Sequence, residues 1–125
     1  MIASRQHVLV LDDDRDFCEL VEAFLEGAAD VDCVAVHSLE ELVLRSEDAL
    51  GCALALLDVN LGPGEPSGLD ALDWLRAKSF GGRTVFLTGH ARGHPRLRLE
   101  VETAGLSVLE KPVDAATLLS LVEAL

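Results

Sequence analysis

Cys52-Ala-Leu-Ala-Leu-Leu-Asp-Val-Asn60 is a nine-residue run that is apolar up to a carboxylate near its end. A continuous apolar run without polar alternation is typical of a strand covered on both faces, as in the middle of a parallel sheet. Asp58 would then lie at the carboxyl end of a central strand, where open α/β sheets bind their ligands. Asp58 is therefore the first candidate for chemistry.

Short apolar runs alternate with amphipathic segments along the rest of the chain. Further strands are expected at residues 8–11, 31–36, 84–87 and 106–109. Apolar side chains at three-and-four spacing predict helices within 17–25, 39–43, 69–75, 97–104 and 115–122. Regular β-α alternation with strands this apolar predicts an α/β fold, a five-stranded parallel sheet with helices on both faces.

Local signals refine these boundaries. Gly27 is a plausible stop for the first helix, and Ser38 with Glu41 three residues later forms a capping-box signature before the second. Residues 96–101 alternate with period two, which alone would suggest a strand. We predict a helix there, because Pro95 suits a first helical turn and a parallel strand pair needs a crossover.

Length and charge limit the functions that the chain can have. Its 125 residues are expected to form one domain over 1–125 with a sizeable core. The 22 acidic and 10 basic side chains give a net charge of -12, which argues against direct nucleic-acid or membrane binding. Residues 83–111 are locally basic, which fits either a docking face for an acidic partner or a solvated helix face.

The cysteines and the N-terminus indicate the compartment. Cys18, Cys33 and Cys52 are odd in number, widely spaced and in apolar surroundings, so they are interpreted as buried reduced thiols. Residues 1–5 carry no long apolar segment that could act as a signal peptide. Both observations predict a cytoplasmic protein.

Polar side chains follow four of the expected strands. Asp12 and Asp13 come after the first strand, Asp58 ends the third, Thr88 follows the fourth, and Lys111 comes just after the fifth. Because the carboxyl ends of parallel strands meet at one edge of a sheet, these side chains are expected to share a pocket.

Such a pocket suits phosphoryl chemistry. Three neighbouring carboxylates repel one another unless one stays protonated or a cation joins them, and oxygen ligands suit Mg²⁺. A phosphoryl group could be held by the metal, the lysine and the threonine while a carboxylate attacks in line. Asp58 is the best-placed nucleophile.

Four short motifs carry a family resemblance that covers the whole chain. The segments Val8-Leu-Val-Leu-Asp-Asp-Asp14, Leu56-Leu-Asp-Val-Asn60, Leu87-Thr-Gly89 and Glu110-Lys-Pro112 resemble, in order, the signature sites of receiver domains of bacterial two-component response regulators. The resemblance implies a doubly wound, flavodoxin-like sheet of order 2-1-3-4-5. It also implies a phosphoprotein in a phosphorelay, with Asp58 accepting a phosphoryl group from a sensor histidine kinase or a histidine phosphotransfer protein.

The resemblance also implies roles for the remaining site residues. Mg²⁺ would be held by Asp13, Asp58 and the backbone carbonyl of Asn60, with Asp12 acting partly through water. Thr88 and Lys111 would bind the phosphoryl oxygens, and a cis bond is expected between Lys111 and proline 112. Asp14 is expected to cap the first helix.

Output in this family would pass through the face made by the helix at 97–104, the strand at 106–109 and the last helix, to an output domain or partner protein, with a homodimer also compatible. Two departures bear on that step. Val108 stands where the family commonly has an aromatic residue, and the loop after Asp58 is about two residues longer, with Gly64, Glu65 and Pro66 as the expected insertion. His90 is expected to border the pocket.

The chain fits a stand-alone receiver and one excised from a longer regulator equally well.

Three functional interpretations are open. The leading one is a phosphorylatable switch whose own pocket catalyses transfer and slow hydrolysis, and which is not an enzyme acting on other molecules. The second is a phosphate-independent pseudo-receiver, although such modules usually lose one of the signature residues and none is lost here. The third is a small phosphatase acting through an aspartyl phosphate, for which the chain leaves no length to form a cap.

Overall fold

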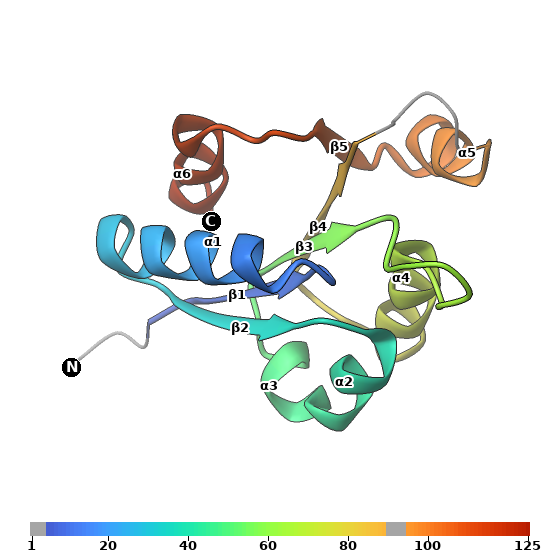
Figure 1. Cartoon of the computed structure of the whole chain (residues 1–125), viewed down its shortest axis with the longest axis horizontal. Coiled ribbons are helices and arrows are strands. Elements are labelled where there is room, and N and C mark those ends of the chain that lie inside the picture. The colour runs from blue at the N-terminus through green and yellow to red at the C-terminus, as the bar shows by residue number, and fades with distance from the viewer. Residues whose placement is uncertain (1–4, 90–94) are drawn as a thin grey trace.

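The computed structural model describes residues 5–89 and 95–125, which form a five-stranded sheet flanked by six helices (Figure 1). The strands are β1 (His7–Leu11), β2 (Asp32–Val36), β3 (Leu54–Asp58), β4 (Arg83–Thr88) and β5 (Ser107–Glu110). The helices are α1 (Arg15–Ala28), α2 (Leu39–Leu44), α3 (Ser46–Leu50), α4 (Gly68–Ala77), α5 (Pro95–Ala104) and α6 (Ala115–Glu123).

The sheet is parallel throughout, with the order β2-β1-β3-β4-β5. Every residue of β3 is buried, as expected of a central strand between two layers of helices. One apolar cluster joins the sheet to α2, α3, α4 and α5, and a second joins its other face to α1 and α6. The predicted fold class and strand order are confirmed.

Side-chain caps fix where most of the longer helices begin. Asp14 accepts a hydrogen bond from the backbone N–H of Phe17, so it caps α1 as predicted. Ser67 and Asp70 form a complete capping box at the start of α4, which brings that helix directly after the loop that follows β3. Asp114 caps α6 in the same way as Asp14 caps α1.

Two helix boundaries differ from the sequence prediction. α1 continues past Gly27 to Ala28, and the chain reverses instead at Asp30, whose φ of 56° is tolerated by aspartate. The helix expected within 39–43 is α2, and the short helix α3 that follows it was not predicted. The backbone of Arg45, with φ -108° and ψ 32°, interrupts them.

The capping-box signature at Ser38 is realised only in part. Ser38 accepts from the N–H of Glu41 at 3.1 Å, but the Glu41 carboxylate accepts from the N–H of His37 rather than from that of Ser38.

The three cysteines are free thiols, with Cys18 and Cys52 buried and Cys33 partly exposed. Burial is the main cause that raises the pKa of Cys18 and of Cys33 to about 12, so neither is a reactive thiolate at neutral pH. Among residues 5–89 and 95–125, no helix has both the length and the apolar character needed to cross a bilayer.

Candidate functional site

A hollow of about 640 Å³ opens at the carboxyl edge of the sheet. Its wall combines the ends of β3 and β4, the loop after β3 and the residue that follows β5. The residues that line it are Asp13, Asp58, Val59, Asn60, Gly62, Pro63, Ser67, Thr88, Gly89 and Lys111. The structure thus brings together side chains that lie up to 98 positions apart in the sequence (13 to 111), as the strand topology predicted.

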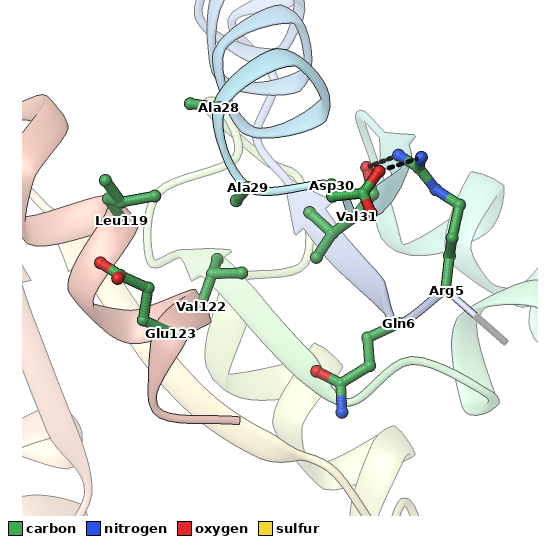
Figure 2. Close-up of a pocket in the computed structure, with 9 residues that line it drawn as sticks. All are labelled: Arg5, Gln6, Ala28, Ala29, Asp30, Val31, Leu119, Val122 and Glu123. Carbon is green, nitrogen blue, oxygen red and sulfur yellow. Dashed lines mark hydrogen bonds and ion pairs between the residues drawn. The ribbon is translucent and has the colours of Figure 1, made fainter. Parts of the chain in front are cut away.

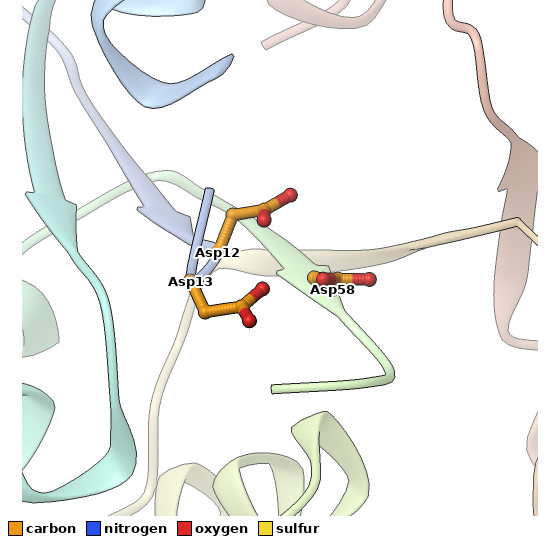
Figure 3. Close-up of side chains that lie close together, drawn as sticks. All are labelled: Asp12, Asp13 and Asp58. Carbon is orange, nitrogen blue, oxygen red and sulfur yellow. The ribbon is translucent and has the colours of Figure 1, made fainter. Parts of the chain in front are cut away.

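Three carboxylates form the acidic part of this site. Asp12 and Asp13 follow β1, Asp58 ends β3, and one oxygen of each lies within 4.8 Å of the others (Figure 3). Asp12 and Asp58 are buried, at 1% and 6% exposure, whereas Asp13 is open to solvent. A cation could therefore approach from the side of Asp13.

Backbone hydrogen bonds hold Asp12 in place. Its N–H continues the β1–β2 ladder by donating to the carbonyl of Val36 at 3.1 Å, and its carboxylate accepts from the N–H of Asp14 at 3.0 Å. The Cys18 thiol donates to its carbonyl at 3.4 Å. Asp12 is therefore held by the strand on one side and by the first turn of α1 on the other.

Asp58 is buried at the end of β3, and the start of α4 packs closely against its backbone. The N–H of Gly68 donates to the carbonyl of Val59 at 2.9 Å, and a Cβ at Gly68 would lie 2.1 Å from the Asp58 carbonyl oxygen. Only glycine fits at this position, so α4 begins against the end of β3. Burial, and then the charge of Asp12, raise the pKa of Asp58 to about 7, although Lys111 acts in the opposite direction.

Lys111 supplies the cation of this group. Its Nζ lies 2.5 Å from Oδ2 of Asp12 and 3.6 Å from Oδ2 of Asp58, and its backbone N–H donates to the carbonyl of Thr88 at 2.9 Å. Burial acts to lower the pKa of Lys111, but the hydrogen bond to Asp12 and the two carboxylate charges outweigh it, so the pKa is raised. The bond from Lys111 to Pro112 is cis, as expected from the resemblance.

Thr88 and Asn60 complete the predicted set. Thr88 is the last residue of β4, is buried and lines the hollow. Asn60 is exposed at the mouth, where its side-chain oxygen accepts from the N–H of Gly62 at 3.0 Å and so fixes the first turn of the loop. His90 lies outside the described residues.

The donor set fits a hard divalent cation. Three carboxylates carry more negative charge than Lys111 offsets, and their oxygens lie close enough together to share one ion. Mg²⁺ prefers such oxygen ligands and keeps several waters, which the open side at Asp13 allows. Asp13, Asp58, Asp12 and the carbonyl of Asn60 are the groups that could hold it.

Sequence reasoning missed one contact in this site. Phe17 was assigned only to the apolar face of the first helix, but its ring lies over the Lys111 ammonium, with Nζ 4.7 Å from the ring centroid. Its position in the first turn of α1, four residues after Asp13, is the signal that could have found it.

Two cations of the basic segment at 83–111 are engaged within the chain. Arg96 pairs with Asp70 and Asp73 on α4, and Arg83 donates to the Ser107 hydroxyl at 3.4 Å. Arg92 lies outside the described residues, and both interpretations of this segment stay open.

A second hollow of about 540 Å³ lies between the end of α1, the start of β1 and α6 (Figure 2). Arg5 lies at its edge and is already paired with Asp30 at 2.5 Å. Among the other lining residues shown in Figure 2, Glu123 adds a single carboxylate, and none adds a further cation. The carboxyl-edge hollow is thus the better candidate site.

Comparisons with known proteins agree with this geometry. A family model described as the response regulator receiver domain matches residues 8–123. No curated protein matches the chain.

Several solved structures share the fold. A CheY-like receiver domain protein from Methanospirillum hungatei is 21% identical, with a TM-score of 0.81 over 97% of this chain and 93% of that one. A CheY-like receiver domain from Methylobacillus flagellatus is 24% identical, with a TM-score of 0.76 over 97% and 98%. The receiver domain of NtrX from Brucella abortus is also 24% identical, with a TM-score of 0.76 over 94% and 95%.

Proposed function

This chain belongs to the family of response regulator receiver domains, and we propose that it is a signalling switch whose Asp58 accepts a phosphoryl group. The observation that carries the proposal is the juxtaposition, at one sheet edge, of the buried Asp58 with an acid pair and a lysine ammonium. We extend the proposed receiver domain to the whole of residues 1–125.

In the proposed transfer, an oxygen of the Asp58 carboxylate attacks the phosphorus of a phosphohistidine on a sensor kinase or phosphotransfer protein. A P–O bond forms to Asp58 and the P–N bond breaks, and the imidazole nitrogen keeps the electron pair and takes up a proton. The attacking oxygen must be ionised. The positive charge of Lys111, 3.6 Å away, supports that state against the effect of burial.

Negative charge must be neutralised while the phosphoryl group approaches three carboxylates. Mg²⁺ bound by Asp13, Asp58 and the Asn60 carbonyl, with Asp12 partly through water, would supply that neutralisation. Lys111 and the Thr88 hydroxyl would bind the phosphoryl oxygens. Both residues line the same hollow as Asp58, which supports these roles.

The switch would act by a shift between two packings. Drawing Thr88 toward the phosphoryl group would displace the end of β4. Val108 on β5 and Leu97 and Val101 on α5 line an apolar hollow of about 260 Å³. We propose the α5, β5 and α6 face as the surface for an output domain, a partner protein or a second copy of the chain.

We place this switch in the cytoplasm, in keeping with its family. The net charge of -12 supports recognition of protein partners rather than direct binding to nucleic acid or an anionic membrane.

Incubation with acetyl phosphate and Mg²⁺, followed by intact mass measurement, tests the proposal. We expect the wild type to gain the mass of one phosphoryl group and the Asp58→Asn protein to gain none. Asp30→Asn is the matched control, because Asp30 is exposed beyond the far end of α1 and asparagine tolerates its φ of 56°.

Phosphorylation of the Asp58→Asn protein would show that another residue accepts the phosphoryl group. A wild type that stays unmodified and binds no beryllofluoride would favour the phosphate-independent pseudo-receiver.

A further inference from the structure

Lys111 has a neighbour that the proposed chemistry does not use. The Phe17 ring lies over its ammonium at 4.7 Å, while the same ammonium donates to Asp12 at 2.5 Å. Phe17 lies in the first turn of α1 and Lys111 directly follows β5, so the contact joins an early and a late segment of the chain across the site.

Neighbouring contacts hold the Phe17 ring in place. Phe17 is partly buried and packs against the apolar cluster between α1, α6 and the sheet. The N–H of Phe17 donates to the helix cap Asp14 at 3.1 Å, which fixes the backbone from which the ring projects. Packing on one side and capping on the other limit how far the ring can move.

We infer that Phe17 is a positioning residue for Lys111, and that its ring face holds the ammonium beside Asp58 without taking any of its hydrogen bonds. This inference rests on the proposed function of Asp58. The ammonium has three N–H donors, and a lysine side chain 25% exposed would otherwise share them with water. The negative face of an aromatic ring attracts a cation without acting as a strong acceptor.

The arrangement would matter when a phosphoryl group arrives. The Lys111 ammonium must then redirect one of its N–H donors from Asp12 to a phosphoryl oxygen on Asp58. A ring face attracts an ammonium similarly over a range of positions, so this movement breaks no hydrogen bond to Phe17. A hydrogen-bond acceptor in place of the ring would have to lose its bond to the ammonium before the ammonium could move.

Aromatic and aliphatic replacements separate this role from simple packing. Phe17→Leu keeps an apolar side chain but removes the ring, whereas Phe17→Tyr keeps an aromatic ring. We expect phosphoryl uptake from acetyl phosphate to be about two- to fivefold slower in Phe17→Leu, with a rate near wild type in Phe17→Tyr. Phe24→Leu is the control, because Phe24 lies on α1 and packs against the same cluster.

An NMR measurement checks the contact without phosphorylation. Protons above a ring face are shifted upfield, so the Hε signals of Lys111 should be shifted upfield in the wild type and in Phe17→Tyr. They should return toward ordinary lysine values in Phe17→Leu and stay unchanged in Phe24→Leu.

Ordinary Hε shifts in the wild type would overturn the inference, as would equal uptake rates in Phe17→Leu and wild type. Equal slowing in Phe17→Leu and Phe24→Leu would assign the effect to packing and also overturn it. A wild type that takes up no phosphoryl group would end the proposed function and the positioning role with it, while the Hε signals report separately whether the contact exists.

Discussion

Asp58→Asn should make the folded chain more stable, although it removes the proposed phosphoacceptor. The pKa of Asp58 is about 7 in the fold, against an ordinary value of 3.8, with burial as the main cause. Each pKa unit corresponds to about 1.4 kcal/mol, so ionised Asp58 costs the fold at most about 4 kcal/mol at pH 8. Asparagine keeps the shape of the side chain without the charge, and we expect a gain of about 2–4 kcal/mol without divalent cations.

The dependence on pH follows from the direction of the shift. Between about pH 4 and pH 7 the folded wild type binds more protons at Asp58 than the unfolded chain does, so its free energy of unfolding falls as the pH rises. Asp58→Asn lacks this titration. The stability advantage of Asp58→Asn over the wild type should therefore grow by about 2–3 kcal/mol from pH 5 to pH 8.

Urea unfolding in the presence of a chelator measures this difference. The single tryptophan, Trp74 on α4, is partly buried against the core and provides a fluorescence signal, which far-UV circular dichroism can check. Asp30→Asn breaks only an exposed ion pair with Arg5, so this control should stay within about 1 kcal/mol of wild type, by the same amount at both pH values. A difference for Asp58→Asn that is constant with pH, or a loss of stability at pH 8, would refute the reasoning.

Three further predictions concern the same edge of the sheet. Lys111→Met leaves Asp12 buried without its cation, so urea unfolding should show a free energy of unfolding lower by about 3 kcal/mol. Acetyl phosphate should also modify this variant about a hundredfold more slowly. An unchanged stability and an unchanged rate would show that Lys111 has no role in the site. Gly68→Ala forces α4 away from the Asp58 carbonyl and should lower the free energy of unfolding by about 3 kcal/mol. Gly27→Ala is the control, because nothing lies within 4 Å of the new Cβ, and it should raise the free energy of unfolding by about 0.5–1 kcal/mol. Equal effects of the two substitutions would contradict the close approach at Gly68. Mg²⁺ at a hundredfold excess over its Kd should stabilise the wild type by about 3 kcal/mol and the Asp58→Asn protein by much less, and equal stabilisation would place the ion elsewhere.

The sequence was sufficient for the fold because its signals are local. The apolar run that ends at Asp58 and the helical spacing of the segments between strands depend only on neighbouring residues. The convergence of Asp12, Asp58, Thr88 and Lys111 follows from topology, since parallel strands bring their carboxyl ends to one edge.

Contacts between distant side chains could not be predicted in the same way. Lys111 lies closer to Asp12 than to Asp58, and its ammonium lies over the ring of Phe17, which is 94 positions earlier in the sequence. Arg96 pairs with Asp70, 26 positions earlier, because α5 packs beside α4. No periodicity encodes such distances.

Backbone geometry explains the two differences from the predicted helices, at the end of α1 and at the break between α2 and α3. The interruption at Arg45 is accompanied by side-chain contacts to the Ala35 carbonyl and to Asp48, which no local propensity reveals. Gly27 was expected to end α1, but glycine permits a stop without requiring one, and the turn at Asp30 ends the helix region instead.

Chemical trapping of the modified side chain tests the central claim most directly. Borohydride reduces an aspartyl phosphate to homoserine, and peptide mass spectrometry then identifies the position at which the aspartate was converted. After treatment with acetyl phosphate and Mg²⁺, we predict homoserine at position 58, with Asp12 and Asp13 intact. Homoserine at another position, or none in a protein that gained a phosphoryl group, would contradict the account.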